Sequence, residues 1–97
     1  MTKFGDLISA QKPVLIDFYS DLEGTKETTK SLRSVSAVFG EKAKIIKIDV
    51  VKNELLADAL EVKENPTFMI YKEGQMKWRH SGSLETNDLI DLVQQYL

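Results

Sequence analysis

The sequence predicts an α/β fold with one mixed four-stranded sheet that carries helices on both faces. Strand-like runs of apolar residues alternate along the chain with segments of helical periodicity. Near the C-terminus two strand-like segments follow each other directly, joined by a turn at residues 72–75, which is typical of a hairpin. Strands connected through helices must be parallel, whereas hairpin strands are antiparallel. The predicted element order is therefore α-β-α-β-α-β-β-α.

The N-terminal part predicts a short helix and the first strand. Residues 2–10 have apolar residues at near-helical spacing, with Thr2 as the N-cap. Pro13 ends this helix, because the residue before a proline is displaced from helical backbone angles. Residues 14–19 are almost continuously apolar, as expected of a strand buried on both faces. Asp17 is the single acid in this strand.

The middle of the chain predicts a long helix, a strand and a short helix. The long helix covers residues 25–39 and ends at Gly40, the strand covers residues 44–51, and the short helix covers residues 54–60. Asn53 is the expected N-cap of the short helix. The long helix is expected to bury Leu32, Val35, Val38 and Phe39. The short helix is expected to bury Leu55, Leu56, Ala59 and Leu60.

The C-terminal part predicts the hairpin strands, at residues 67–71 and 76–80, and a last helix capped by Thr86. That helix is expected to bury Leu89, Ile90, Val93, Tyr96 and Leu97. Alternation along the second hairpin strand places Trp78 and His80 on one face and Lys77 and Arg79 on the other. We expect a helix to cover Trp78; the alternative is an exposed tryptophan that anchors a partner.

Composition excludes several classes of function. The 97 residues have the size of one domain, which we expect to cover residues 1–97. Thirteen Lys and Arg oppose fifteen Asp and Glu, for a net charge of −2, so the basic excess of a nucleic-acid-binding protein is missing. The chain has no cysteine, which excludes disulfides and thiol catalysis, and its one histidine, His80, argues against a His-based metal site. We expect no metal and no cofactor.

The apolar runs are too short for a membrane span or a secretory signal. The expected location is therefore the cytoplasm, with no membrane partner. The sequence leaves the oligomeric state open.

Four segments in order resemble the thioredoxin family. Residues 12–19 resemble the strand that leads into its active site, and residues 65–68 resemble its loop with a cis proline, here Pro66. Residues 71–74 resemble its hairpin turn, and Gly82 resembles the glycine before its last helix. The resemblance runs from about residue 12 to 97 and implies a thioredoxin-like α/β/α sandwich. The usual first strand of the family is short or missing.

The chain departs from the family at the site of its chemistry. The family motif Trp-Cys-Gly-Pro-Cys-Lys aligns with Leu-Glu-Gly-Thr-Lys-Glu at residues 22–27. Glu23 and Lys26 stand where the two cysteines would be, and neither can attack a disulfide. The resemblance therefore implies a redox-inactive, non-catalytic protein.

The resemblance also implies a groove that binds a peptide or protein partner, because the family pairs an extended peptide with the backbone before its proline. The implied groove residues are Leu22, Glu23, Gly24, Thr25, Lys26, Asn65, Pro66, Thr67, Ser81 and Gly82. Alternatively, the proline loop serves only the fold, and the chain is a purely structural subunit.

Two groups of charged residues have a functional and a structural interpretation. Asp21, Glu23 and Glu27 could hold a hard cation in a carboxylate- or metal-dependent enzyme, or they could complement the dipole of the following helix. Asp17 and Lys47 match a family pair that moves protons for the cysteines. Without a thiol, they are expected to be a vestigial buried pair.

Overall fold

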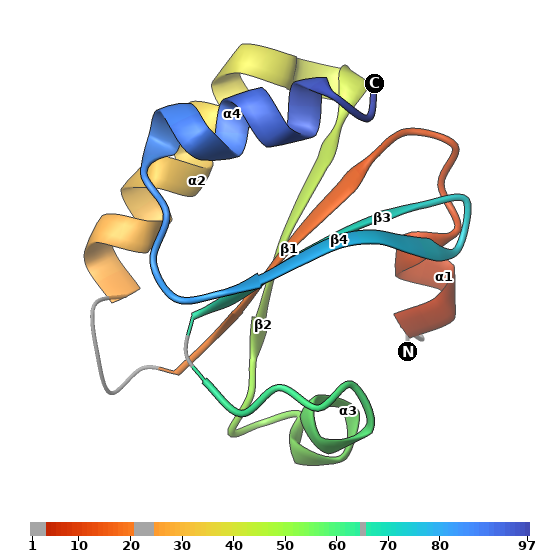
Figure 1. Cartoon of the computed structure of the whole chain (residues 1–97), viewed down its shortest axis with the longest axis vertical. Coiled ribbons are helices and arrows are strands. Elements are labelled where there is room, and N and C mark those ends of the chain that lie inside the picture. The colour runs from red at the N-terminus through yellow and green to blue at the C-terminus, as the bar shows by residue number, and fades with distance from the viewer. Residues whose placement is uncertain (1–3, 21–24, 65) are drawn as a thin grey trace.

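The computed structural model describes residues 4–20, 25–64 and 66–97, without the side chains of residues 25–29. The strands are β1 (Val14–Tyr19), β2 (Lys44–Asp49), β3 (Thr67–Lys72) and β4 (Gln75–Ser81). The helices are α1 (Phe4–Ile8), α2 (Thr25–Phe39), α3 (Glu54–Ala59) and α4 (Thr86–Gln94), and the single-turn 3₁₀ helix η1 (Gly40–Lys42) follows α2. The predicted element order is confirmed (Figure 1).

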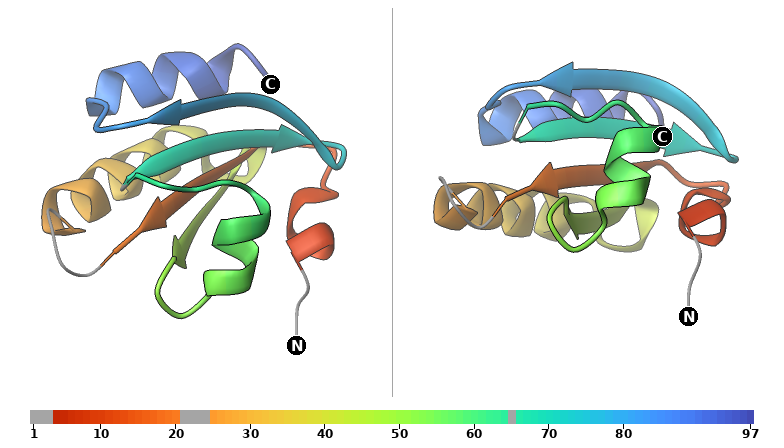
Figure 2. Two further views of the ribbon diagram at one scale, coloured as in Figure 1. Left: turned by 60° about the horizontal axis from the view of Figure 1, so that its bottom comes forward. Right: turned by 90° about the horizontal axis from the view of Figure 1, so that it is seen from below.

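The four strands form one mixed sheet in the order β2-β1-β3-β4. Strands β1 and β2 are parallel, whereas β1–β3 and β3–β4 are antiparallel. Helices α2 and α4 lie on one face of the sheet, and α1 and α3 lie on the other (Figure 2). The predicted fold class is therefore confirmed.

The face under α2 and α4 holds the first of two apolar cores. Its fully or nearly fully buried members are Leu15, Leu32, Val35, Phe39, Ala43, Phe68, Ile70, Leu89 and Val93. Trp78 packs against this core and stacks on His80, with 5.9 Å between the ring centroids. Trp78 and His80 thus share a face, as alternation predicted.

The face under α1 and α3 holds the second core, whose buried members are Ile8, Val14, Ile16, Phe18, Ile48, Met69 and Tyr71. Strand β1 supplies side chains to both cores, which explains its nearly continuous apolar sequence. Helix α1 ends at Ile8, two residues before the predicted end, and the carbonyls at this end of the helix bond the hairpin turn. Ile8 accepts from the Gly74 amide and Ala10 from the Glu73 amide, both at 2.9 Å.

The β3–β4 hairpin turns through Glu73 and Gly74, which have φ angles of 54° and 81°. Two positive φ angles in a two-residue loop give a turn whose twist matches that of the strands. The pairing of β3 with β4 then shifts register between Ile70 and Tyr71, which face Trp78 and Met76. This irregularity is a β-bulge, so strict alternation fails at one position of β4.

Several predicted burial positions are wrong. Val38 is 58% exposed and Leu55 is 88% exposed, while Ala57 is buried in place of Ala59. Leu97 lies beyond α4 and is also exposed.

The predicted end of the second strand and two predicted caps also differ from the structure. Strand β2 ends at Asp49 because this carboxylate accepts the Val51 amide at 2.8 Å and starts a turn. Asn53 is the N-cap residue of α3 as predicted, but its side chain donates to the Asp49 carbonyl and makes no capping hydrogen bond. Glu85, not Thr86, is the N-cap residue of α4. Thr2 lies outside the described residues.

Candidate functional site

The loop that enters β3 is held at two points. The Thr67 hydroxyl donates to the Glu64 carbonyl at 2.7 Å, and the Gly82 amide donates to the Pro66 carbonyl at 2.8 Å. Thr67 itself is fully buried, in register with Phe18 on one side. These bonds hold the backbone of Glu64 and Pro66 against the start of β3 and the residue that follows β4.

The end of β4 lies beside this loop. Ser81 is in register with Thr67, and their hydroxyl oxygens are 3.4 Å apart. Ser81 is exposed, whereas Pro66 and Gly82 are half-buried. Gly82 has a φ of 104°, which strains any other residue, although a Cβ there would only touch His80 at 3.8 Å. The structure thus brings together Pro66, Thr67, Ser81 and Gly82.

The remaining predicted groove residues cannot be placed as side chains. Leu22, Glu23, Gly24 and Asn65 lie outside the described residues, and Thr25 and Lys26 are described only as the first backbone positions of α2. Asp21 is also outside this range, and so is the side chain of Glu27. Within the described part of the chain, no group of three His, Cys, Asp or Glu side chains is arranged to hold a metal ion.

Asp17 is fully buried on β1, in register with Lys47 on β2. Neither carboxylate oxygen accepts a hydrogen bond from the described residues. Burial raises the pKa of Asp17 from 3.8 to about 6, and the positive charge of Lys47 opposes this shift. Lys47 is exposed, with its ammonium 4.4 Å from the Tyr19 ring centroid. Only the acidic member of the predicted buried pair is therefore buried.

The sequence did not predict the role of Arg79, a residue of β4 whose side chain reaches the C-terminal end of α3. Its guanidinium donates to the carbonyls of Leu60 at 2.6 Å and Glu61 at 2.7 Å. Glu61 has a φ of 56°, and the Val62 amide reaches back to the Ala57 carbonyl at 2.9 Å. This is a helix end of the left-handed type, completed by a side chain from β4.

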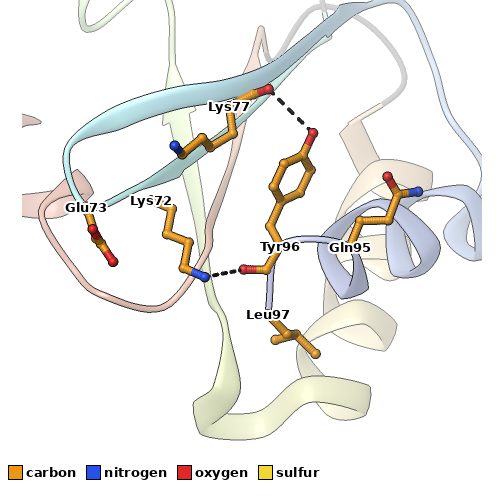
Figure 3. Close-up of a pocket in the computed structure, with 6 residues that line it drawn as sticks. All are labelled: Lys72, Glu73, Lys77, Gln95, Tyr96 and Leu97. Atoms are coloured by element: carbon orange, nitrogen blue, oxygen red, sulfur yellow. Dashed lines mark hydrogen bonds between the residues drawn. The ribbon is translucent and has the colours of Figure 1, made fainter.

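A cavity of about 380 Å³ lies between the β3–β4 hairpin and the end of α4. Figure 3 shows the side chains that line it. It is lined by Lys72, Glu73, Lys77, Gln95, Tyr96 and Leu97. The Lys72 ammonium donates to the Tyr96 carbonyl at 2.9 Å, and the Tyr96 hydroxyl donates to the Lys77 carbonyl at 3.4 Å. Because Lys72 and Thr67 occupy opposite ends of β3, this cavity is separate from the proline loop.

Comparison with known proteins identifies the family. A family model described as Thioredoxin matches residues 1–95. The chain belongs to the thioredoxin family. It is similar to chloroplastic thioredoxin Y of Oryza sativa subsp. japonica, with 34% identity over 99% of this chain. The chain spans 58% of the length of that relative.

Two further thioredoxins match more of their own length. The thioredoxin of Rickettsia felis is 26% identical over 91% of this chain and 85% of its own. The structure of mitochondrial thioredoxin 3 from Saccharomyces cerevisiae, in the oxidized form, has a TM-score of 0.84 at 26% identity. It covers 95% of this chain and 86% of its own, so the chain has the thioredoxin-like fold.

This thioredoxin-family chain contains no cysteine within its 97 residues. Disulfide exchange proceeds by attack of a thiolate on a disulfide sulfur, and the chain supplies no thiolate. None of the helices in the described ranges has the length and apolar character that a membrane span requires.

Proposed function

We propose that this protein is a non-catalytic member of the thioredoxin family that binds an extended peptide or protein segment at the groove around Pro66. The supporting observation is that two hydrogen bonds hold the loop before β3 in place. Thr67 and Gly82 hold the backbone on both sides of position 65, although the chain has no cysteine that this loop could serve.

The groove offers backbone groups and small side chains. An extended peptide bound by strand addition gains affinity from main-chain hydrogen bonds, which require a rigid template. Ser81 and Gly82 flank the loop with little side-chain bulk, so they leave room for a second backbone. We propose that the ten groove residues named from the sequence act together, with the 97 residues as one thioredoxin-like unit.

The experiment is a titration of the ¹⁵N-labelled protein with extended peptides selected on a random peptide array. We expect the amide signals of Thr67, Ser81 and Gly82 to shift with saturation. Ser81→Lys places a long side chain at the groove and should weaken binding at least tenfold. Ser36→Lys makes the same change on the exposed face of α2 and should leave binding unchanged.

Equal binding by the two variants, or shifts confined to residues remote from Pro66, would contradict the proposal. Stabilisation by Mg²⁺ or Ca²⁺ that disappears in Glu23→Gln would instead support the acidic segment as the functional site.

We further propose a cytoplasmic location, based on the short apolar runs of the sequence. The similar rice protein is named as chloroplastic. Recovery of this chain from purified plastids of its source cells, after fractionation and immunoblotting, would contradict the proposed location.

A further inference from the structure

We propose that the open edge of β2 is a second interaction surface, which pairs with an extended acidic segment of another protein. Strand β2 has a strand neighbour on one side only within the described residues, and this position can be followed in Figure 2. A strand with an open side presents a row of backbone donors and acceptors to any chain that can extend along it.

The backbone orientation identifies the positions that face this edge. The amides of Lys44 and Val50 donate to the carbonyls of Pro13 and Tyr19, both at 2.9 Å, and so point toward β1. Because backbone direction alternates along a strand, the main chain of Ile45, Lys47 and Asp49 faces the open side. The Asp49 carbonyl already accepts from the Asn53 side chain at 2.9 Å. New pairing is therefore expected around Ile45.

The two edges of the sheet differ in regularity. Strand β2 pairs with β1 through six consecutive register partners without a shift, from Val14 with Lys44 to Tyr19 with Asp49. Strand β4, at the other edge, contains the β-bulge, and bulges twist an edge away from pairing. Ile45 and Ile46 are also only half-buried, one against each core. An added strand would therefore cover apolar surface on the face to which its own apolar side chains point.

Charge identifies the partner. The segment from Glu41 to Lys52 carries four lysines, at positions 42, 44, 47 and 52, in a chain whose net charge is −2. Its two acids are Glu41 and Asp49, so the segment has a net charge of +2. The buried Asp49 carboxylate accepts hydrogen bonds from the Val51 and Lys52 amides. Antiparallel pairing of two copies would bring the lysines of both β2 strands together, and like charges facing each other across strands are destabilising. A partner segment that alternates apolar and acidic residues fits this edge.

The probe is a short, acetylated and amidated peptide of alternating glutamate and valine, added to the ¹⁵N-labelled protein. We expect the Ile45 amide to exchange rapidly with solvent in the free protein and at least tenfold more slowly at saturating peptide. The same peptide with lysine in place of glutamate should not protect this amide. An N-methylated version, which lacks alternate backbone donors, should not protect it either.

Matched variants separate backbone pairing from folding and charge. Ile45→Pro removes the backbone donor at the open edge and should therefore abolish binding. The variant should still fold, because a proline is tolerated in an edge strand where its nitrogen faces outward. Ile45→Ala loses similar packing but keeps the donor, so binding should remain within about threefold. Lys44→Gln should weaken binding about two- to fivefold, the effect of one exposed ion pair. Lys77→Gln, on the other edge strand, should have no effect.

The proposal is overturned if the acidic peptide leaves the exchange of the Ile45 amide unchanged, or if the acidic and lysine peptides bind equally. It is also overturned if the protein alone forms a dimer with a protected Ile45 amide, because the occupant would then be a second copy.

Discussion

At the scale of single residues, Asp17 is the feature that the sequence and the structure both mark as unusual. A buried carboxylate is stable in its charged form only when donors or a cation compensate for the lost hydration. Here the two oxygens have no donor among the described residues, and Lys47 is exposed beside Tyr19. The carboxyl group therefore gains a proton more readily in the folded chain than in the unfolded chain.

We predict that Asp17→Asn stabilises the protein at pH 7. The folded pKa of about 6 lies above the ordinary 3.8, so the folded state binds the proton more tightly. The contribution of Asp17 to stability should then be greatest below pH 4 and should fall as the pH rises to about 6. The difference between the folded and the ordinary pKa corresponds to about 3 kcal/mol, which is the upper limit of the gain in unfolding free energy for Asp17→Asn.

Urea unfolding between pH 4 and 8 measures this effect. In Asp17→Asn the part of the pH dependence due to this group should disappear, whereas Asp91→Asn, on the exposed face of α4, should change stability by less than about 0.5 kcal/mol. An unchanged pH profile in Asp17→Asn would show that the carboxyl group is hydrated in the folded chain.

At the scale of secondary-structure elements, α3 depends on β4. Helix α3 has only six residues, and helices this short are not stable alone in water. The guanidinium of Arg79 binds the last carbonyls of the helix, while Glu61 takes a positive φ that favours glycine. The orientation of α3, and with it the start of the loop to Pro66, is thus set by a contact between distant segments.

We predict that Arg79→Lys destabilises the protein by about 1 kcal/mol, because an ammonium cannot bond both carbonyls in the planar geometry of a guanidinium. Amide exchange at Glu61 and Val62 should accelerate most. Arg33→Lys, on the exposed face of α2, is the matched control and should be neutral. If exchange rises equally throughout the chain, Arg79 contributes to global stability rather than to the end of α3.

The errors of sequence interpretation also belong to this scale. Long segments with clear boundaries were predictable: β1 covers its predicted residues, and α2 ends before Gly40, which takes a φ of 55°. The buried side of α3 was not predictable, since adjacent leucines in a six-residue helix define no single stripe. Ala57 is buried and Leu56 packs against the second core, whereas Leu55 is exposed.

At the scale of the whole molecule, the fold was predictable because the order of patterned segments and the thioredoxin resemblance agree. The contacts at the candidate site were less predictable from the sequence. The hydrogen bond from Gly82 to Pro66 and the contacts of Arg79 with α3 join residues far apart in sequence. Periodicity describes one segment at a time and contains no information on such pairs.

We predict that the protein has no disulfide reductase activity. Its only sulfur atoms are the thioethers of Met1, Met69 and Met76, and a thioether cannot take part in thiol–disulfide exchange. In an insulin reduction assay with dithiothreitol, precipitation should proceed at the rate of the blank. Acceleration in proportion to protein concentration would contradict a redox-inactive chain.

A Glu23→Cys/Lys26→Cys double variant tests whether the scaffold still supports the chemistry of its family. Strand β1 ends at Tyr19 and α2 begins at Thr25, so the two substituted positions bracket the start of a fifteen-residue helix. A helix N-terminus stabilises a thiolate and lowers the pKa of a cysteine below the free value of about 8.5. If the family resemblance of Asp17 and Lys47 extends to function, we expect this pair to move the proton of the new thiol.

We expect this double variant to form a reversible intramolecular disulfide and to show weak insulin reduction, because the tryptophan and proline of the family motif remain absent. The single variants Glu23→Cys and Lys26→Cys are the controls and should show neither property. If mild oxidation of the double variant yields only intermolecular disulfides, its substituted positions do not have thioredoxin geometry. The groove proposal would then lose its support on the α2 side and depend on Pro66, Thr67, Ser81 and Gly82 alone.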